Sequence, residues 1–307
     1  MPAETIRFFS RNAESFQELL SDAKRAELAP TAISGVLHLP EQTSQPVPLV
    51  ITSLGPGGFA AGREALYADA FTAAGVAMMA VDSYGARGFS ETRTDQGRIS
   101  TATACADAVY AFEHMRRDER IDTDRIALFG YSRGGSVVLM TNNDRLQGSI
   151  LGTDARFAAY VALYPSVWLR WVHPRPTGGP VLAVLAERDD MAPLDRQRER
   201  MAELTAAGAN LETLVMPLVG HSFDAVYPAS FRNGANFCDW DIAVDDDGSM
   251  HETKSGVRDA DDWAEFLRAI RAARDTTSGG TTGYGGAPRS VAVAPVIAFI
   301  TRTLLQR

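Results

Sequence analysis

The chain has 307 residues, of which 45% are hydrophobic and 22% charged, a balance typical of a globular protein with a sizeable core. Its formal net charge of −8 argues against nucleic acid or an anionic membrane surface as a partner, because both attract basic proteins. No apolar run reaches the roughly 18 residues of a membrane span and no leader peptide is evident, so we expect one cytoplasmic domain over residues 1–307 that acts on a small molecule.

The first half of the chain alternates between runs typical of buried strands and runs typical of helices. We expect strands at 6–9, 33–40, 48–53, 76–81 and 126–130, and helices at 13–26, 63–74 and 103–117. Alternation of this kind predicts an α/β fold in which a mostly parallel sheet is covered by helices on both faces.

The strand at 126–130 leads into a GxSxG pentapeptide, Gly130-Tyr131-Ser132-Arg133-Gly134. In a nucleophile elbow the serine sits in a strained conformation at the tip of a strand–turn–helix, where side chains two residues away on either side would collide. The pattern therefore predicts Ser132 as a nucleophile, with the N–H of Arg133 directed at the oxyanion. The bland alternative is an ordinary Gly/Ser turn.

A glycine-rich loop, Leu54-Gly-Pro-Gly-Gly58, follows the strand at 48–53. Such loops expose backbone N–H groups, so we expect a second oxyanion donor here, near Gly55. The alternative is a flexible turn.

The second half continues with strands expected at 160–164, 181–185 and 211–216 and a helix at 194–207. Trp168 and Trp171 lie between two of these strands, three residues apart, which would place them on one helical face. Packing is the favoured role for both, although a pocket roof that includes Trp168 is the alternative.

A serine nucleophile needs a base, and the base needs an acid that fixes its tautomer. Among the five histidines, His221 directly follows the last strand, so it is the predicted base. Asp189 and Asp190 both follow the preceding strand; we favour Asp189 as the acid and keep Asp190 as the alternative. Either aspartate could instead only cap the next helix.

Residues 225–288 depart from the alternation, and we expect an insertion or lid-like segment there. An acidic run at 245–248 superficially suggests a calcium loop, but Ala243 and Lys254 stand where acidic ligands are needed, so a solvated turn is predicted. Residues 276–288 have the composition of a mobile linker, and 290–305 form a predicted closing helix. With two cysteines and neither a CxxC nor an HExxH motif, we expect no metal and no cofactor.

Four blocks of the sequence resemble the dienelactone hydrolase-like family of α/β-hydrolases: Asp82-Ser-Tyr-Gly-Ala-Arg-Gly, Asp124-Arg-Ile-Ala-Leu-Phe-Gly-Tyr-Ser-Arg-Gly-Gly, Glu187-Arg-Asp-Asp-Met-Ala-Pro and Gly220-His-Ser-Phe-Asp. The resemblance spans about 33–224. It implies Ser132 as nucleophile, Asp189 as acid, His221 as base, and backbone donors near Gly55 and at Arg133. Dienelactone hydrolases proper use a cysteine nucleophile, so dienelactone itself is not the expected substrate.

The leading hypothesis is a serine hydrolase that cleaves a small-molecule carboxylic ester, lactone or thioester through an acyl-enzyme. An oligopeptidase or amidase with the same triad, and a non-catalytic binding protein, are the alternatives. Substrate contacts are expected from Arg87, Tyr131 and Trp168, with Arg87 or Arg133 orienting an anionic group; an internal salt bridge is the competing role for Arg87. Whether the chain forms a homo-oligomer is left open.

Overall fold

The computed structural model describes residues 3–41, 45–59, 62–93, 95–225, 228, 230–232, 237, 239–259, 262–274, 279–283 and 289–306. Its strands are β1 (Glu4–Arg11), β2 (Pro30–His38), β3 (Val47–Ser53), β4 (Ala77–Asp82), β5 (Ile121–Tyr131), β6 (Ala159–Leu163), β7 (Leu169–Trp171), β8 (Val181–Ala186), β9 (Leu211–Met216), β10 (Ser230–Arg232), β11 (Ile242–Val244), β12 (Met250–Glu252) and β13 (Gly280–Thr282). Its helices are α1 (Phe16–Leu20), α2 (Asp22–Glu27), η1 (Gly85–Arg87), η2 (Gln96–Arg98), α3 (Arg63–Ala73), α4 (Thr101–Met115), α5 (Arg133–Thr141), α6 (Asp144–Leu151), α7 (Leu194–Ala206), α8 (Trp263–Ala273), α9 (Ser290–Ile300) and η3 (Thr301–Leu305).

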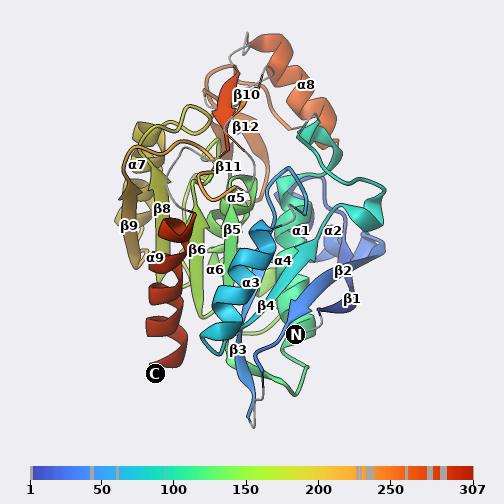
Figure 1. Ribbon diagram of the computed structural model, residues 1–307. Helices are drawn as coiled ribbons and strands as arrows, with labels where there is room; N and C mark the ends of the chain where they lie inside the picture. Colours follow the sequence, from blue (N-terminus) through green and yellow to red (C-terminus); the bar gives the residue numbers. More distant parts are fainter. Residues whose placement is uncertain are drawn as a thin grey trace.

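Eight strands form one large sheet in the order β1-β2-β4-β3-β5-β6-β8-β9 (Figure 1). From β4 to β9 all neighbouring strands are parallel, whereas β2 runs antiparallel to β4 and β1 antiparallel to β2. The prediction of a mostly parallel sheet is confirmed. The strand expected at 6–9 is longer than its sequence signal, and it covers the outer edge of the flanking strand.

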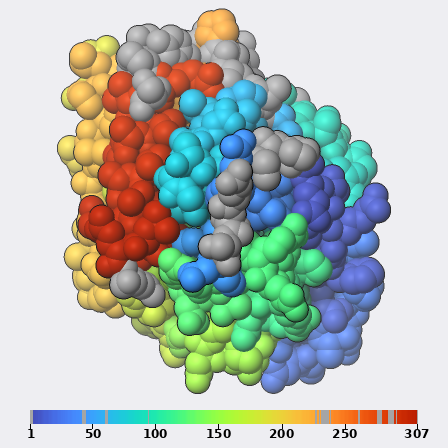
Figure 2. Space-filling view, turned by 60° about the horizontal axis from the view of Figure 1, so that its bottom comes forward, coloured from blue at the N-terminus to red at the C-terminus, as the bar shows by residue number. Residues whose placement is uncertain are grey.

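The sheet buries both faces, because alternate residues of its central strands point into two different apolar clusters. Leu49 and Ile51 belong to the cluster under α4, α5 and α6, whereas Val50 belongs to the cluster under α3 and α9. Figure 2 shows α9 (red) lying beside α3 (cyan) on one side of the molecule. Helices on both faces leave the carboxyl ends of the parallel strands as the edge where loops can gather.

The closing helix was predicted from its apolar spacing, and the buried residues agree with that pattern. Val293, Val296, Ile300 and Leu304 are all buried in the cluster shared with α3. Within the described ranges, no helix combines the length and apolar character that crossing a membrane requires. The cytoplasmic location and the single domain stay predictions.

The chain between β6 and β8, and after β9, adds small sheets that the sequence reading missed. β7 is a strand, so the expectation of a helical face shared by Trp168 and Trp171 is wrong; β7 pairs in parallel with β11, which pairs with β12. Residues 245–248 form the predicted turn, in which the Gly248 N–H donates to the Asp245 carbonyl (2.9 Å). In Figure 1, α8 and β10 lie at one end of the molecule, beyond β11.

Much of the range 276–288 lies outside the described residues, but 280–283 are ordered against the rest of the protein. β13 pairs antiparallel with β10, and Thr282 forms an isolated bridge with His221. For these residues the linker expectation is wrong, because their backbone groups pair with other segments. That 225–288 act as a lid stays a prediction.

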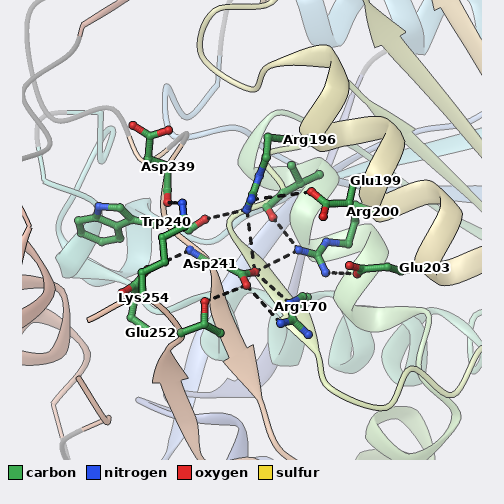
Figure 3. Close-up of polar contacts among 12 residues, drawn as sticks. Arg170, Arg196, Glu199, Arg200, Glu203, Asp239, Trp240, Asp241, Glu252 and Lys254 are labelled. Carbon is green, nitrogen blue, oxygen red and sulfur yellow. Dashed lines mark hydrogen bonds and ion pairs between the residues drawn. The ribbon is translucent and has the colours of Figure 1, made fainter. Parts of the chain in front are cut away.

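A cluster of charged residues joins the β11–β12 hairpin to β7 and to α7 (Figure 3). Asp241 lies at its centre, where Arg170 of β7 makes a two-point contact (2.9 and 3.2 Å) and Arg200 of α7 approaches to 3.3 Å. Arg196, one turn earlier in α7, is 4.0 Å away, and the Thr253 hydroxyl donates from beyond β12 (3.0 Å). Arginines of β7 and α7 thus hold Asp241, which directly precedes β11, and Thr253 joins it to the end of the same hairpin.

Candidate active site

Ser132 lies at a sharp turn between the end of β5 and the first residue of α5. Its backbone has φ 56° and ψ −119°, a strained conformation for a residue with a side chain. A Cβ atom at Gly130 would lie 2.2 Å from the Gly134 carbonyl oxygen, and one at Gly134 would lie 2.1 Å from the Ser53 carbonyl oxygen. Only glycine fits at either position, so the turn has the steric features of a nucleophile elbow.

The three residues expected to form a triad are joined by hydrogen bonds. Ser132 Oγ lies 2.8 Å from His221 Nε2, and His221 Nδ1 lies 2.8 Å from Asp189 Oδ2. All three side chains are buried. An ionised carboxylate can only accept a hydrogen bond, so the imidazole proton sits on Nδ1, which donates to Asp189. Nε2 then carries no proton and can take that of Ser132.

The structure separates Asp189 from its neighbour Asp190, which the sequence left as alternatives. The second oxygen of Asp189 accepts the N–H groups of Met191 (2.9 Å) and Ala192 (2.8 Å), which fixes the carboxylate. Asp190 instead accepts the N–H of Thr281 at 2.9 and 3.0 Å. Asp189 is therefore the partner of His221, and Asp190 binds the segment that runs alongside.

The loop that carries His221 is held by backbone contacts and has two residues in the left-handed region. Leu218 (φ 62°) and Ser222 (φ 60°) flank the histidine, and the Gly283 N–H donates to the His221 carbonyl (3.0 Å). Strain of this kind persists only where the surroundings hold it. Residues 281–283 thus contact both the acid loop and the base loop.

Two backbone segments lie where an oxyanion could be bound. Arg133 begins α5, so its N–H has no partner in the preceding turn and lies at the positive end of the helix dipole. A Cβ atom on Gly55 would lie 3.2 Å from the Tyr131 ring, which places the glycine-rich loop directly against the elbow. The Tyr84 hydroxyl donates to the Gly55 carbonyl (3.0 Å) and fixes this loop.

The Arg87 guanidinium donates to groups inside the protein. Its guanidinium makes a two-point ion pair with buried Asp107 (2.8 and 2.9 Å) and also donates to Asn12 Oδ1 (2.8 Å) and the Ser83 carbonyl (2.7 Å). This is the internal salt bridge that competed with a substrate role. The ion pair gives Arg87 a structural role in place of the expected substrate contact.

The Arg133 side chain is likewise bonded to groups inside the protein. It is buried and donates to Thr92 Oγ1 (3.3 Å) and to the Ile99 carbonyl. Only the backbone N–H of Arg133 therefore remains a candidate for contact with the substrate.

Tyr131 and Trp168 are both buried in packing roles. The Tyr131 hydroxyl donates to Glu64, and its ring carries the Arg63 guanidinium 4.5 Å above its centre. The Trp168 ring packs among Phe237, Trp240 and Trp263, with centroid separations of 5.4, 6.3 and 5.9 Å. Trp168 has the packing role that was favoured for it. Tyr131 is part of the buried packing at the elbow.

Sequence reasoning missed a polar group beside the triad. Asp224, three residues after His221, is fully buried and accepts from Tyr67 (2.9 Å) and Tyr164, while Arg63 Nε lies 3.5 Å from it. The only signal was the aspartate in Gly220-His-Ser-Phe-Asp, which has no role by spacing alone.

The chain resembles known proteins in both sequence and fold. The dienelactone hydrolase family matches residues 33–245. A protein named as a dienelactone hydrolase from Klebsiella pneumoniae subsp. pneumoniae is 18% identical, with a TM-score of 0.52, over 73% of this chain and 90% of that one. A dienelactone hydrolase-like promiscuous phosphotriesterase from metagenomic libraries is 15% identical, with a TM-score of 0.50, over 73% and 85%. At these identities the two structures show a shared α/β-hydrolase fold. Among curated proteins there is no match.

Proposed function

The chain belongs to the dienelactone hydrolase family, and we propose that it is a serine hydrolase that cleaves a small-molecule carboxylic ester through Ser132, His221 and Asp189. The observation that carries the proposal is the unbroken chain of hydrogen bonds from Ser132 Oγ through His221 to Asp189, which starts from a serine held at φ 56°. Family membership supports hydrolysis, and the geometry supports the nucleophile.

The proposed reaction has two steps. His221 Nε2 takes the proton of Ser132 as its oxygen attacks the ester carbonyl, and the N–H groups of Arg133 and Gly55 donate hydrogen bonds to the carbonyl oxygen as it becomes negative. The protonated His221 then gives its proton to the leaving alcohol, and the acyl group stays on Ser132. In the second step His221 activates a water, which releases the acid and restores the serine.

Asp189 acts throughout by orienting the imidazole and stabilising its positive charge. Its two further hydrogen bonds, from Met191 and Ala192, hold it in place as His221 gains and loses a proton. A carboxylate fixed in this way needs no rearrangement during the reaction, which is the advantage of a preorganised site.

The test is the hydrolysis of short and long p-nitrophenyl esters by the wild type and Ser132→Ala. We expect the variant to lose at least about a thousandfold in kcat, the usual scale for removal of a triad nucleophile. Ser149→Ala is the matched control, because among the described residues that hydroxyl on α6 bonds only to the Leu19 and Leu146 carbonyls. Retention of most turnover in Ser132→Ala would reject the proposal.

A second measurement applies where the enzyme does not accept p-nitrophenyl esters as substrates. A serine-directed phosphonate probe should label the wild type at Ser132 and leave Ser132→Ala unlabelled. Absence of labelling together with absence of turnover would favour a non-catalytic protein that has kept the fold.

A further inference from the structure

Tyr164 contacts the predicted base from a side that the triad does not occupy. It directly follows β6, has φ 32°, and is fully buried, with its N–H donating to the Val184 carbonyl (2.6 Å). Its ring meets the His221 ring edge to face, with centroids 5.0 Å apart and an interplanar angle of 66°. A residue with a side chain adopts a positive φ only at a cost, so this placement is imposed by the surrounding structure.

The hydroxyl of the same side chain is bonded to Asp224. Tyr164 donates to one carboxylate oxygen, and Tyr67 of α3 donates to the other (2.9 Å). Burial, with the nearby Asp224 charge among the further causes, raises the pKa of both phenols well above the usual value, so both stay neutral donors. The Tyr164 side chain therefore contacts the imidazole through its ring and a buried carboxylate through its hydroxyl.

A phenol that donates to a carboxylate gains electron density in its ring, because hydrogen bonds in a chain polarise one another. An electron-rich aromatic ring attracts a neighbouring cation, and the attraction is greatest where water is excluded. His221 carries a positive charge only while it holds the serine proton, so this attraction favours the transition state over the resting enzyme.

We propose that Asp224, acting through Tyr164, is a second carboxylate that stabilises the protonated form of His221 and fixes the plane of its ring. The inference rests on the proposed function, since it needs His221 as the base. Asp224 touches no reacting atom, so it is a positioning residue, and Tyr164 is its link to the histidine.

The groups around both partners limit the size of the effect. Among the described residues, His221 faces Asp189 from beyond β8, Ser132 from the elbow and Tyr164 from beyond β6. Asp224 faces Tyr67 and Arg63 of α3, and its carbonyl accepts from Arg289 (3.0 Å). Because Arg63 offsets part of the carboxylate charge, we expect a modest contribution.

Tyr164→Phe and Tyr67→Phe form a matched pair. Each removes one hydroxyl from the same carboxylate, but only Tyr164 touches His221. In Tyr164→Phe we expect kcat/KM to fall about threefold to tenfold. We also expect the midpoint of its acid limb to move about half a unit to lower pH, because protonated His221 loses stabilisation. In Tyr67→Phe the acid limb should stay in place, while thermal stability falls by a similar amount in both variants.

Asp224→Asn provides an independent measurement. It should move the acid limb in the same direction as Tyr164→Phe, and adding it to Tyr164→Phe should produce little further movement, because both changes break one link. Equal profiles for the two phenylalanine variants, or an unmoved acid limb in Tyr164→Phe, would overturn the proposal.

The same experiment distinguishes its failure from failure of the proposed function. If the wild type shows neither Ser132-dependent turnover nor phosphonate labelling, the proposed function fails and the inference falls with it. If the wild type turns over and Tyr164→Phe matches Tyr67→Phe, only the role of Asp224 is rejected.

Discussion

Asp224 and Asp241 each gather several donors around one carboxylate, but the donors differ in charge. Two tyrosine hydroxyls and one arginine surround Asp224, which lies under the His221 loop. Asp241 is surrounded by three arginines and one threonine hydroxyl, which come from β7, α7 and the end of the β11–β12 hairpin (Figure 3). Arg63 offsets part of the negative charge of Asp224 and its two other donors are neutral, whereas three arginines converge on Asp241.

A buried carboxylate can serve two purposes, and its donors decide which. A charge that is only partly offset can still act on a neighbouring histidine. A charge that is fully paired joins separate segments, and removing one partner leaves the others buried without compensation. Variants in the two regions should therefore change different measurements: catalysis near Asp224, and stability near Asp241.

The largest expected effect tests which aspartate acts directly on His221. Asp189→Asn should lower kcat by about 10⁴-fold, because an amide can hold the wrong imidazole tautomer and carries no charge. Asp190→Ala, one residue away, should lower kcat less than about tenfold, since the Asp190 carboxylate accepts the Thr281 N–H, whereas it is Asp189 that bonds to His221. Equal losses in the two variants would mean that Asp189 is not the acid.

The next effect should appear in stability and leave the chemistry intact. Asp241→Asn should lower the free energy of unfolding by about 3 kcal/mol, because partly buried Arg170 loses its two-point counter-charge and buried Arg200 loses one of its two, keeping Glu203. Chemical unfolding would measure this loss. Asp195→Asn is the control, since that carboxylate at the start of α7 is almost fully exposed. A large fall in kcat of folded Asp241→Asn would break the comparison between the two regions.

The stability that Asp241→Asn loses should depend on pH. Burial by itself raises the pKa of Asp241, but the hydrogen bonds and charge of Arg170, with Thr253 and Arg200, outweigh burial and hold this pKa below its usual value. A depressed native pKa gives stability that is complete above the unfolded pKa of about 3.9 and is lost as the pH falls through the native value. The stability difference between wild type and Asp241→Asn should thus be constant from pH 7 to about 5 and shrink below about pH 4.

The smallest effect sharpens the picture of the Asp241 cluster itself. Arg196 lies 4.0 Å from Asp241 and is partly exposed, so Arg196→Ala should cost about 0.5 kcal/mol, as for other exposed ion pairs. Arg170→Ala, which removes the two-point contact, should cost clearly more in the same unfolding experiment. If Arg196→Ala were the more costly of the two, the cluster would depend on α7 and not on β7.

Much of the fold could be predicted because its signals are local. The apolar runs at 48–53, 76–81 and 211–216 became β3, β4 and β9. The helix α8 could also have been found: Trp263, Phe266, Leu267 and Ile270 have helical spacing and are buried, and Asp262 caps the first turn by accepting the Glu265 N–H (2.7 Å). The small strands β10 to β13 have three residues each, which is too short for a periodic signal.

The elbow and the order of its partners follow from the sequence alone. A Cβ atom at position 130 or 134 would collide with backbone a few residues away or at the end of the neighbouring strand β3, so the pentapeptide itself requires glycine there. His221 was identified by its place after the last strand, which topology fixes.

The groups that each buried side chain meets depend on how distant segments pack. Asp189 and Asp190 are equivalent by position, and Thr281, 91 residues from Asp190, separates them. Arg87 is used by Asp107, and Asp224 meets Tyr67 across 157 residues. Local spacing fixes backbone conformation, because its steric conflicts are local, whereas the partner of a buried charge is set by packing between segments that are distant in the chain.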